Sequence, residues 1–238
     1  MHKVASVGSL PDAGEPAPRA VASPAAAVAA FDFDGTLTRR DTLLPYLRRG
    51  LGWPRFLLAL LRSSPWLAAY ACGLTSNHIA KARLLQASLG GRTEQEGVQW
   101  AADFVANYLP RQWQQETLAQ LAQHQKLGHC CVIVSASPGI YLHDVGRMLG
   151  MDGVICTELA SQDGALTGRM TTPNCHGQEK VRRLHAWLTA RGLQKPVVLH
   201  AYGDSSGDVP LLNLADYAHY QGQPWVRRPS RHWDAQQP

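Results

Sequence analysis

The sequence lacks any cysteine pair with CxxC spacing, and its five cysteines form an odd set. Neither a zinc site nor a disulfide framework is therefore indicated, and this cysteine usage fits a reducing cytosol. Charged residues make up only 17% of the chain, and its arginines are scattered or paired rather than massed. A net charge of +5 in that pattern does not predict nucleic-acid binding. We expect a cytoplasmic protein without an obligate protein partner.

A secretory leader and a membrane-spanning segment are also not indicated. Residues 1–27 are rich in Ala, Pro, Gly and Ser, and four prolines interrupt any apolar run there. A signal peptide needs a continuous apolar centre, so we interpret this stretch as a disordered leader. Residues 226–238 are interpreted as a tail. The chain between them is long enough for one large domain that carries an insertion.

Short apolar runs alternate with helical patterns through most of the chain. The runs "AAAVAAFDF", "HCCVIVSASPG", "GVICTEL", "KPVVLHAYGD" and "YAHYQ" are typical of strands. Ser137-Pro138 predicts a helix cap followed by a first-turn proline, and Asp163-Gly164 predicts a hairpin turn. Strands that alternate with helices predict an α/β fold, in which helices wrap a parallel sheet.

The stretch between the first two strands is too long for a simple crossover. We expect residues 44–121 to form an inserted, all-helical cap on a core of residues 28–43 and 122–225. Within the cap, Thr93 and Glu96 have the spacing of a capping box. The residues expected to line one face of that helix are Val98, Ala102, Val105 and Leu109.

Polar residues stand where the predicted strands end, and ligands bind beyond the carboxyl ends of strands in an open parallel sheet. A hydroxyl and a lysine are expected to join four carboxylates there: Asp32, Asp34, Ser135, Lys180, Asp204 and Asp208. Crowded carboxylates repel one another, and Mg²⁺ suits a few carboxylates combined with a substrate phosphate. One carboxylate can attack phosphorus, and a neighbour can handle the proton.

These motifs resemble the haloacid dehalogenase superfamily, and within it the phosphoserine-phosphatase-like subclass with a helical cap after the first strand. "DFDGT", Ser135, Lys180 and "GDSSGD" stand in the family's order. The resemblance implies a Rossmann-like core and assigns Asp32 as nucleophile and Asp34 as general acid/base.

The resemblance also implies which residues bind the metal and the phosphoryl group. Mg²⁺ would be held by the Asp32 carboxylate, the Asp34 main-chain oxygen and Asp204. Asp208 would support this metal shell. The substrate phosphoryl group would be held by Ser135, Ala136 and Lys180.

Asp34 favours phosphatase chemistry, because dehalogenases and P-type ATPases of this superfamily lack an acid at that position. The expected activity is Mg²⁺-dependent hydrolysis of a small organic phosphate, such as a phosphoserine-like metabolite, through an aspartyl-phosphate. Asp41 lies where phosphoserine phosphatases carry a substrate-reading acid. It is equally suited to cap the helix that begins at "TLLPYLRR".

Two alternatives remain open. The apolar stretch "RRGLGWPRFLLALLRSSPWLAAYACG" is expected to be broken by Arg55, Arg62 and Ser63 to Pro65 into two short helices. These helices form either the core of the cap or an interfacial pair. The apolar stretch resembles the cap of phosphatidylglycerophosphate phosphatases. An interfacial pair would predict an amphiphilic substrate and peripheral contact at the inner membrane face. A non-catalytic scaffold is the other alternative, although all four motif acids are present.

Overall fold

The computed structural model describes residues 26–193 and 197–226 of the chain. Most of the predicted leader and tail therefore lies outside the described residues. Ala26 and Ala27, which the prediction assigned to the leader, form the start of the first strand, β1 (Ala26–Phe31). Both pair with the first residues of another strand, β7 (Val197–Gly203), in agreement with the strand predicted from "AAAVAAFDF".

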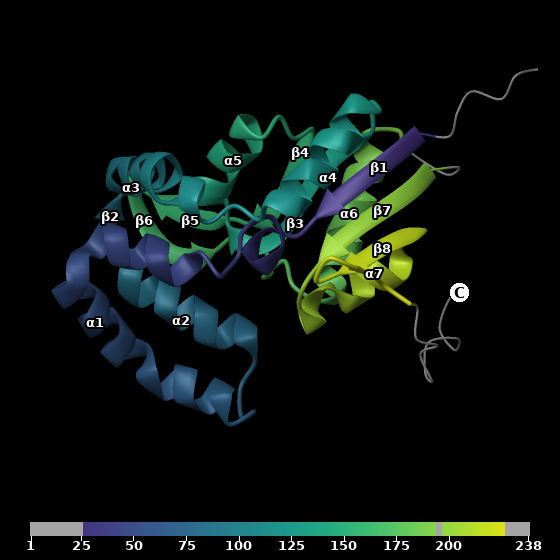
Figure 1. The fold of residues 1–238 in the computed structure, drawn as a ribbon. Helices are drawn as coiled ribbons and strands as arrows, with labels where there is room; N and C mark the ends of the chain where they lie inside the picture. Colours follow the sequence, from purple (N-terminus) through teal and green to yellow (C-terminus); the bar gives the residue numbers. More distant parts are fainter. Residues whose placement is uncertain (1–25, 194–196, 227–238) are drawn as a thin grey trace, which may run out of the picture.

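The main sheet has six strands, as Figure 1 shows in part. Their order is β4-β3-β1-β7-β8-β9, with β3 (Cys130–Pro138), β4 (Gly153–Thr157), β8 (Tyr217–Tyr220) and β9 (Gln223–Pro224). All neighbouring pairs are parallel except β8 and β9. The predicted parallel sheet is therefore confirmed, with a short antiparallel strand added at one edge.

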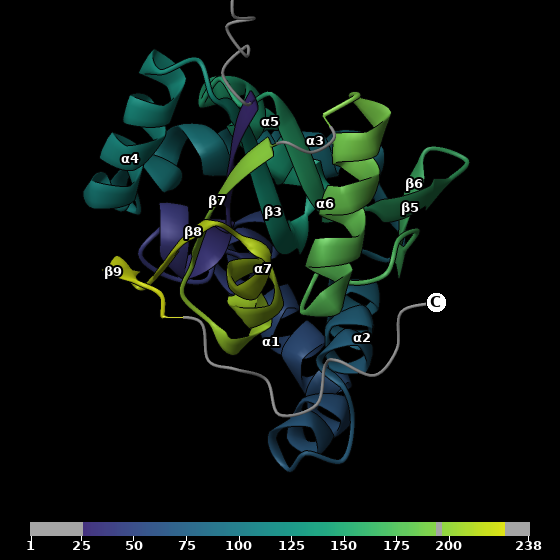
Figure 2. The same ribbon diagram turned by 90° about the vertical axis from the view of Figure 1, so that its right-hand side faces the viewer.

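Helices cover both faces of this sheet, and the side chains of β1 therefore alternate between two buried cores. Ala29 and Phe31 belong to a core shared with α4 (Gln115–Lys126) and α5 (Gly139–Met148), whereas Val28 and Ala30 face α6 (Gln178–Ala190) and α7 (Val209–Leu214). Figure 2 shows α4 and α6 on opposite sides of the strands. Strands buried on both faces have the continuous apolar pattern seen in the sequence.

The segment predicted as the cap contains three helices, α1 (Leu43–Ala71), α2 (Asn77–Leu89) and α3 (Glu94–Asn107). The α1 and α2 helices extend away from the main sheet (Figure 1). The predicted boundary at residue 121 stays a prediction. However, α4 runs across this boundary, and its Leu121 is buried in the core that also contains Phe31 of β1.

A second, antiparallel sheet shows that the inserted segment is not wholly helical. The predicted Asp163-Gly164 hairpin joins β5 (Leu159–Gln162) to β6 (Ala165–Met170), and both turn residues have positive φ. A two-residue strand of the inserted segment, β2 (Arg92–Thr93), pairs with β6. This partner was not predicted, because two residues carry no strand periodicity.

The break predicted at Ser63 to Pro65 does not occur. The α1 helix continues through these residues and departs from helical geometry at Gly52, where φ is 71°. Pro65 cannot donate the backbone hydrogen bond to the Leu61 carbonyl, but the Ser64 hydroxyl donates to that oxygen at 2.8 Å. Among the described helices, none is long and apolar enough to cross a bilayer.

Helix α3 begins as predicted but buries a partly different face. The Thr93 and Glu96 capping box is present. The buried residues, however, are Gly97, Ala101 and Phe104, and Val98 remains 57% exposed. The prediction was therefore wrong for Val98 and Ala102, which are exposed, whereas Val105 packs against the core and Leu109 is buried just after the helix ends. The buried stripe is displaced because Gly97 lies close to Ile140 of α5 and Leu166 of β6.

Candidate active site

Three adjacent parallel strands bring most of the predicted site residues together. Asp32 follows β1, Asp204 follows β7, and Ser135 lies near the end of β3. The carboxyl ends of these strands meet at one edge of the sheet, where they border a cavity of about 570 Å³. The predicted residues that line this cavity are Asp32, Asp34, Asp41, Ser135, Ala136, Lys180 and Asp204.

Lys180 joins two of the acids at the base of the site. It lies in the first turn of α6, as predicted, and is only 2% exposed. Its Nζ donates to Asp32 Oδ1 at 2.6 Å and to Asp208 Oδ1 at 2.5 Å. Burial opposes the lysine charge, but the two carboxylates outweigh burial and raise the pKa of Lys180. Lys180 therefore stays charged between the two aspartates.

Asp208 is fully buried and supports the site from behind rather than lining the cavity. Its Oδ2 accepts hydrogen bonds from the Ser205 hydroxyl at 2.7 Å and from the Ser205 backbone N–H at 3.0 Å. Burial alone would raise its pKa, but Lys180 and the Ser205 hydrogen bonds lower it. Asp208 thus remains ionised and holds Lys180 in place.

Asp34 is held by two hydroxyls and one backbone N–H. Its Oδ1 accepts from the Thr42 N–H at 2.7 Å and from the Thr42 hydroxyl at 2.6 Å, and its Oδ2 accepts from the Ser137 hydroxyl. Burial and the nearby Asp41 raise the pKa of Asp34 to about 6, although these hydrogen bonds lower it. A carboxyl group with that pKa can both release and accept a proton near neutral pH.

Ser137 does not cap α5, so the prediction for this residue was wrong. It belongs to β3, makes no capping hydrogen bond and donates to Asp34 instead. Its place in the site could have been found from the alternation of β3, because residues two apart on a strand share a face. Ser135 lies two residues earlier, and its Oγ accepts the Ser137 N–H at 3.2 Å.

Three carboxylates lie close enough together to hold a divalent cation. Asp32, Asp204 and Asp208 each place one oxygen within 4.8 Å of the others. Burial raises the pKa of Asp32 to about 8, against the opposing effect of Lys180, and burial also raises the pKa of Asp204. One lysine therefore leaves negative charge uncompensated, and a hard cation with oxygen ligands fits this site. The Asp34 side chain lies outside this group.

Gly35 is required by the approach of Asp204. Its φ is 78°, and a Cβ built at this position would overlap the Asp204 carboxylate. Only glycine combines this backbone conformation with so close a neighbour. The glycine of "DFDGT" thus allows β1 and β7 to bring Asp32 and Asp204 into one group.

Asp41 has features of both predicted roles. Its Oδ1 accepts the backbone N–H of Leu43 at 3.0 Å, which is a local contact at the start of α1. It is also exposed and lines the cavity. A substrate-reading role for Asp41 therefore stays a prediction.

Lys81 was missed by the sequence analysis. It lies on α2, lines the cavity, and donates from Nζ to the Ala136 carbonyl at 2.5 Å and to Asn174 Oδ1 at 3.2 Å. Burial lowers the pKa of Lys81 to about 8. No local motif marks this lysine, because only the packing of α2 against the core brings it to the site.

Comparison with known proteins identifies the family. A model of haloacid dehalogenase-like hydrolases matches residues 29–213, so the chain belongs to this hydrolase family, as the motifs indicate. Protein CicA of Caulobacter vibrioides (strain NA1000 / CB15N) is 35% identical over 201 residues, which cover 82% of this chain and 87% of the relative. A histidinol-phosphatase of Neisseria meningitidis serogroup C is 26% identical over 200 residues, covering 79% of this chain and 86% of the relative.

The fold itself resembles that of solved phosphatases. A substrate-bound phosphoserine phosphatase structure aligns with a TM-score of 0.58 and 16% identity, over 81% of this chain and 84% of that one. The predicted resemblance to phosphoserine phosphatases is therefore confirmed at the level of the fold.

Proposed function

We propose that this protein hydrolyses phosphate monoesters through an aspartyl-phosphate formed on Asp32. The observation that carries the proposal is the pairing of Asp32, held by Lys180, with Asp34, held by Thr42 and Ser137, at the edge of one cavity. The two acids have different partners, and groups with separated environments can take different roles in one reaction. The name of the Neisseria relative, a histidinol-phosphatase, supports the same class of reaction.

The proposed reaction has two steps. In the first, an Asp32 oxygen forms a bond to phosphorus while the bond from phosphorus to the ester oxygen breaks, and the Asp34 carboxyl gives its proton to the leaving oxygen. In the second, Asp34 takes a proton from a water molecule whose oxygen attacks the same phosphorus, which releases phosphate and the Asp32 carboxylate. Ser135 and Lys180 hold the phosphoryl oxygens in both steps.

Mg²⁺ is the proposed cofactor, with Asp32, Asp204 and the Asp34 main-chain oxygen as ligands and Asp208 in support. When bound, it would neutralise charge on the phosphoryl oxygens. The closely grouped oxygens of Asp32, Asp204 and Asp208, together with the raised pKa values of Asp32 and Asp204, support this assignment.

A small organic phosphate is the proposed substrate. The cavity volume of about 570 Å³ suits a metabolite, and its lining includes both Asp41 and Lys81. An ester that bears an amine, as phosphoserine does, would place that amine against Asp41.

The test is phosphate release from a broad panel of phosphomonoesters with Mg²⁺, in which Asp32→Asn is compared with the wild type. We expect turnover of at least one soluble ester and its loss in Asp32→Asn, whose side chain cannot act as a carboxylate nucleophile. Turnover that survives Asp32→Asn would refute the covalent mechanism. If the wild type releases phosphate from no ester, the non-catalytic scaffold becomes the better reading.

A lipid phosphate is the second candidate, and the exposed apolar side chains of α1 favour it. Trp53, Leu57 and Leu61 are 58%, 55% and 70% exposed. Arg48 lies over the Trp53 ring, with 5.1 Å between the guanidinium carbon and the ring centre. Exposed apolar residues beside arginines are typical of helices that lie in the headgroup region of a bilayer.

Flotation with vesicles that contain phosphatidylglycerophosphate separates the two substrates. The lipid candidate predicts flotation and phosphate release, and it predicts loss of both in a Trp53→Ser, Leu57→Ser, Leu61→Ser triple variant. Leu127→Ser is the control, since Leu127 is 62% exposed directly after α4 and lies outside the inserted helices. Rapid turnover of soluble esters without flotation would exclude the lipid candidate.

A further inference from the structure

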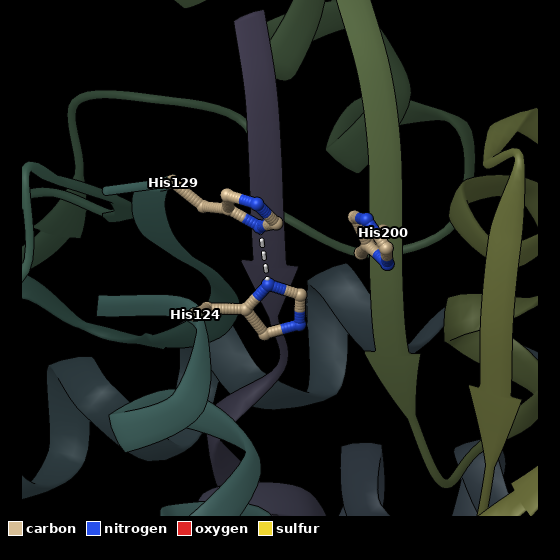
Figure 3. A group of neighbouring side chains, drawn as sticks. All are labelled: His124, His129 and His200. Atoms are coloured by element: carbon tan, nitrogen blue, oxygen red, sulfur yellow. Dashed lines mark hydrogen bonds between the residues drawn. The ribbon is translucent and has the colours of Figure 1, made fainter. Parts of the chain in front are cut away.

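Three histidines gather on the face of the main sheet that α4 covers. His124 lies in the last turn of α4, His129 precedes β3, and His200 lies in β7 (Figure 3). Each offers one ring nitrogen, and the three nitrogens lie within 4.8 Å of one another. No residue of this group belongs to the Asp32, Asp204 and Asp208 group.

The rings are arranged closely, and two of them share a proton. His124 Nδ1 and His129 Nδ1 face each other at 2.8 Å, so one nitrogen donates and the other offers its lone pair. The His200 ring centre lies 4.7 Å from that of His124 and 5.6 Å from that of His129. A tetrahedral ion with bonds of about 2.0–2.1 Å separates its nitrogen ligands by about 3.3 Å, so small side-chain rotations would accommodate it.

The second nitrogen of His124 is already fixed in the way that a metal ligand requires. His124 Nε2 and the Tyr202 hydroxyl are hydrogen-bonded at 2.8 Å. In the tautomer whose Nε2–H donates to Tyr202, the Nδ1 lone pair of His124 is directed at His129. Metal-ligating histidines almost always have such an outer partner, which sets the tautomer and the ring orientation.

The three histidine rings differ in their exposure to solvent. His124 is 5% exposed, whereas His129 and His200 are half-buried, which gives an ion a route from solvent. Burial and the neighbouring imidazoles also lower the pKa of His124 to about 4, so this ring is neutral at physiological pH. Neutral imidazole is the form that binds metals.

We propose that His124, His129 and His200 form a binding site for an imidazole-preferring divalent transition-metal ion, with Zn²⁺ as the representative ion. Three imidazoles suit Zn²⁺, Co²⁺, Ni²⁺ and Cu²⁺, and they do not suit Mg²⁺, which takes oxygen ligands. Bound there, the ion would tie the end of α4 to β7.

The test first removes bound metal from the full chain with a chelator and then measures Zn²⁺ binding by calorimetry. The titration contains an excess of Mg²⁺, which occupies the site formed by Asp32 and Asp204. Absorption of Co²⁺ in the visible range reports the ligand geometry independently of activity. We expect the wild type to bind one Zn²⁺ per chain and to show a raised melting temperature. The affinity for Zn²⁺ should be weaker by about tenfold or more in His129→Ala and in His200→Ala. These two residues are chosen because they are partly exposed, so that their removal leaves a smaller cavity than removal of the buried His124 would.

Two control variants locate the bound ion. His185→Ala removes an exposed histidine of α6 outside the group, and Asp204→Asn weakens the acid site. Both should bind Zn²⁺ as the wild type does. The proposal is overturned if the wild type takes up no Zn²⁺ in excess Mg²⁺. It is also overturned if His129→Ala and His200→Ala bind normally, or if Asp204→Asn alone abolishes binding.

Discussion

Lys180 illustrates how a single charge determines the state of two buried acids. Lys180 contacts Asp32 and Asp208. The side chains of both aspartates are almost inaccessible to water, so water cannot take the place of the lysine as their partner. A buried ion pair is weak evidence for stability, but removal of one partner leaves an unpaired buried charge, which is costly. Here the removal of one lysine would leave two such charges.

The first prediction follows for Lys180→Met. We expect a loss of about 3–5 kcal/mol in the free energy of unfolding near neutral pH. Without the lysine, burial would raise the pKa of Asp208 above its unfolded value and would raise the already high pKa of Asp32 further, so the folded variant binds more protons than the wild type. Its deficit should therefore shrink as pH falls. Urea denaturation at about pH 7.5 and about pH 5 measures this change.

Lys126→Met is the matched control, since Lys126 is exposed in the last turn of α4. Its free energy of unfolding should change by about 0.5 kcal/mol or less. A deficit in Lys180→Met that is independent of pH would contradict the explanation by unpaired carboxylates.

Lys81 provides a second prediction at the scale of a residue. Because burial lowers its pKa to about 8, Lys81 loses its charge as pH rises through that value. If its charge attracts the ester, KM should increase above about pH 8 in the wild type. Lys81→Arg keeps the charge and should show no such increase, whereas Lys81→Met should have a high KM throughout. Steady-state kinetics against pH make the measurement, and an identical rise in Lys81→Arg would rule out Lys81 as its cause.

At the scale of elements, the contact between α2 and β6 holds Lys81 in place. Gly168 of β6 has a φ of 68°, and a Cβ there would lie 2.6 Å from the backbone of Leu85 and Gln86 in α2. This approach admits no side chain, because backbone atoms cannot turn away as a flexible side chain can. The small second sheet thus sets the position of the inserted helix that reaches the cavity.

The third prediction concerns this contact. Gly168→Ala should weaken folding by more than the roughly 1 kcal/mol that positive φ alone costs alanine, and it should raise KM by displacing α2. Gly164→Ala is a matched control in the same hairpin, with a φ of 75° and no atom within 4 Å of its added Cβ. Thermal denaturation and kinetics compare the two. Equal effects would indicate that backbone conformation, and not the contact with α2, accounts for the loss.

At the scale of the whole molecule, the candidate site joins segments that are distant in the chain. Asp32, Lys180 and Asp208 come from β1, the start of α6 and the turn after β7, and none of these forms the site alone. A cation bound to Asp32 and Asp204 would therefore link the segment after β1 to the segment after β7. A ligand that binds only the folded state raises the free energy of unfolding.

The fourth prediction is that Mg²⁺ stabilises the wild type and that a chelator removes both this stabilisation and activity. The gain should reach about 2.7 kcal/mol when free Mg²⁺ exceeds its Kd about a hundredfold. Asp204→Asn should gain much less, because it loses a charged ligand. Melting temperature measured against Mg²⁺ concentration tests this expectation, and an equal gain in both proteins would place the ion elsewhere.

Much of the element order could be predicted from local signals. The apolar runs identified the strands, the Thr93 and Glu96 spacing identified the start of α3, and Asp163-Gly164 identified the hairpin. These features depend on neighbours within a few residues. Part of the buried face of α3 was predicted wrongly, because it depends on the contact of Gly97 with distant residues. The course of α1 through Pro65 was also predicted wrongly, because the Ser64 hydroxyl donates to the carbonyl that Pro65 leaves without a donor.

The sequence by itself determined the family, the parallel sheet and the strand-end acids, since each is encoded by a short motif next to a buried run. Only the tertiary structure decided how these residues are used. In the folded protein, the Ser137 hydroxyl donates to Asp34, and Lys81 of α2 lies at the cavity. His124, His129 and His200, which come from three separate segments, lie together. The physical reason is that such contacts depend on how distant segments pack, and no local pattern of residues encodes that packing.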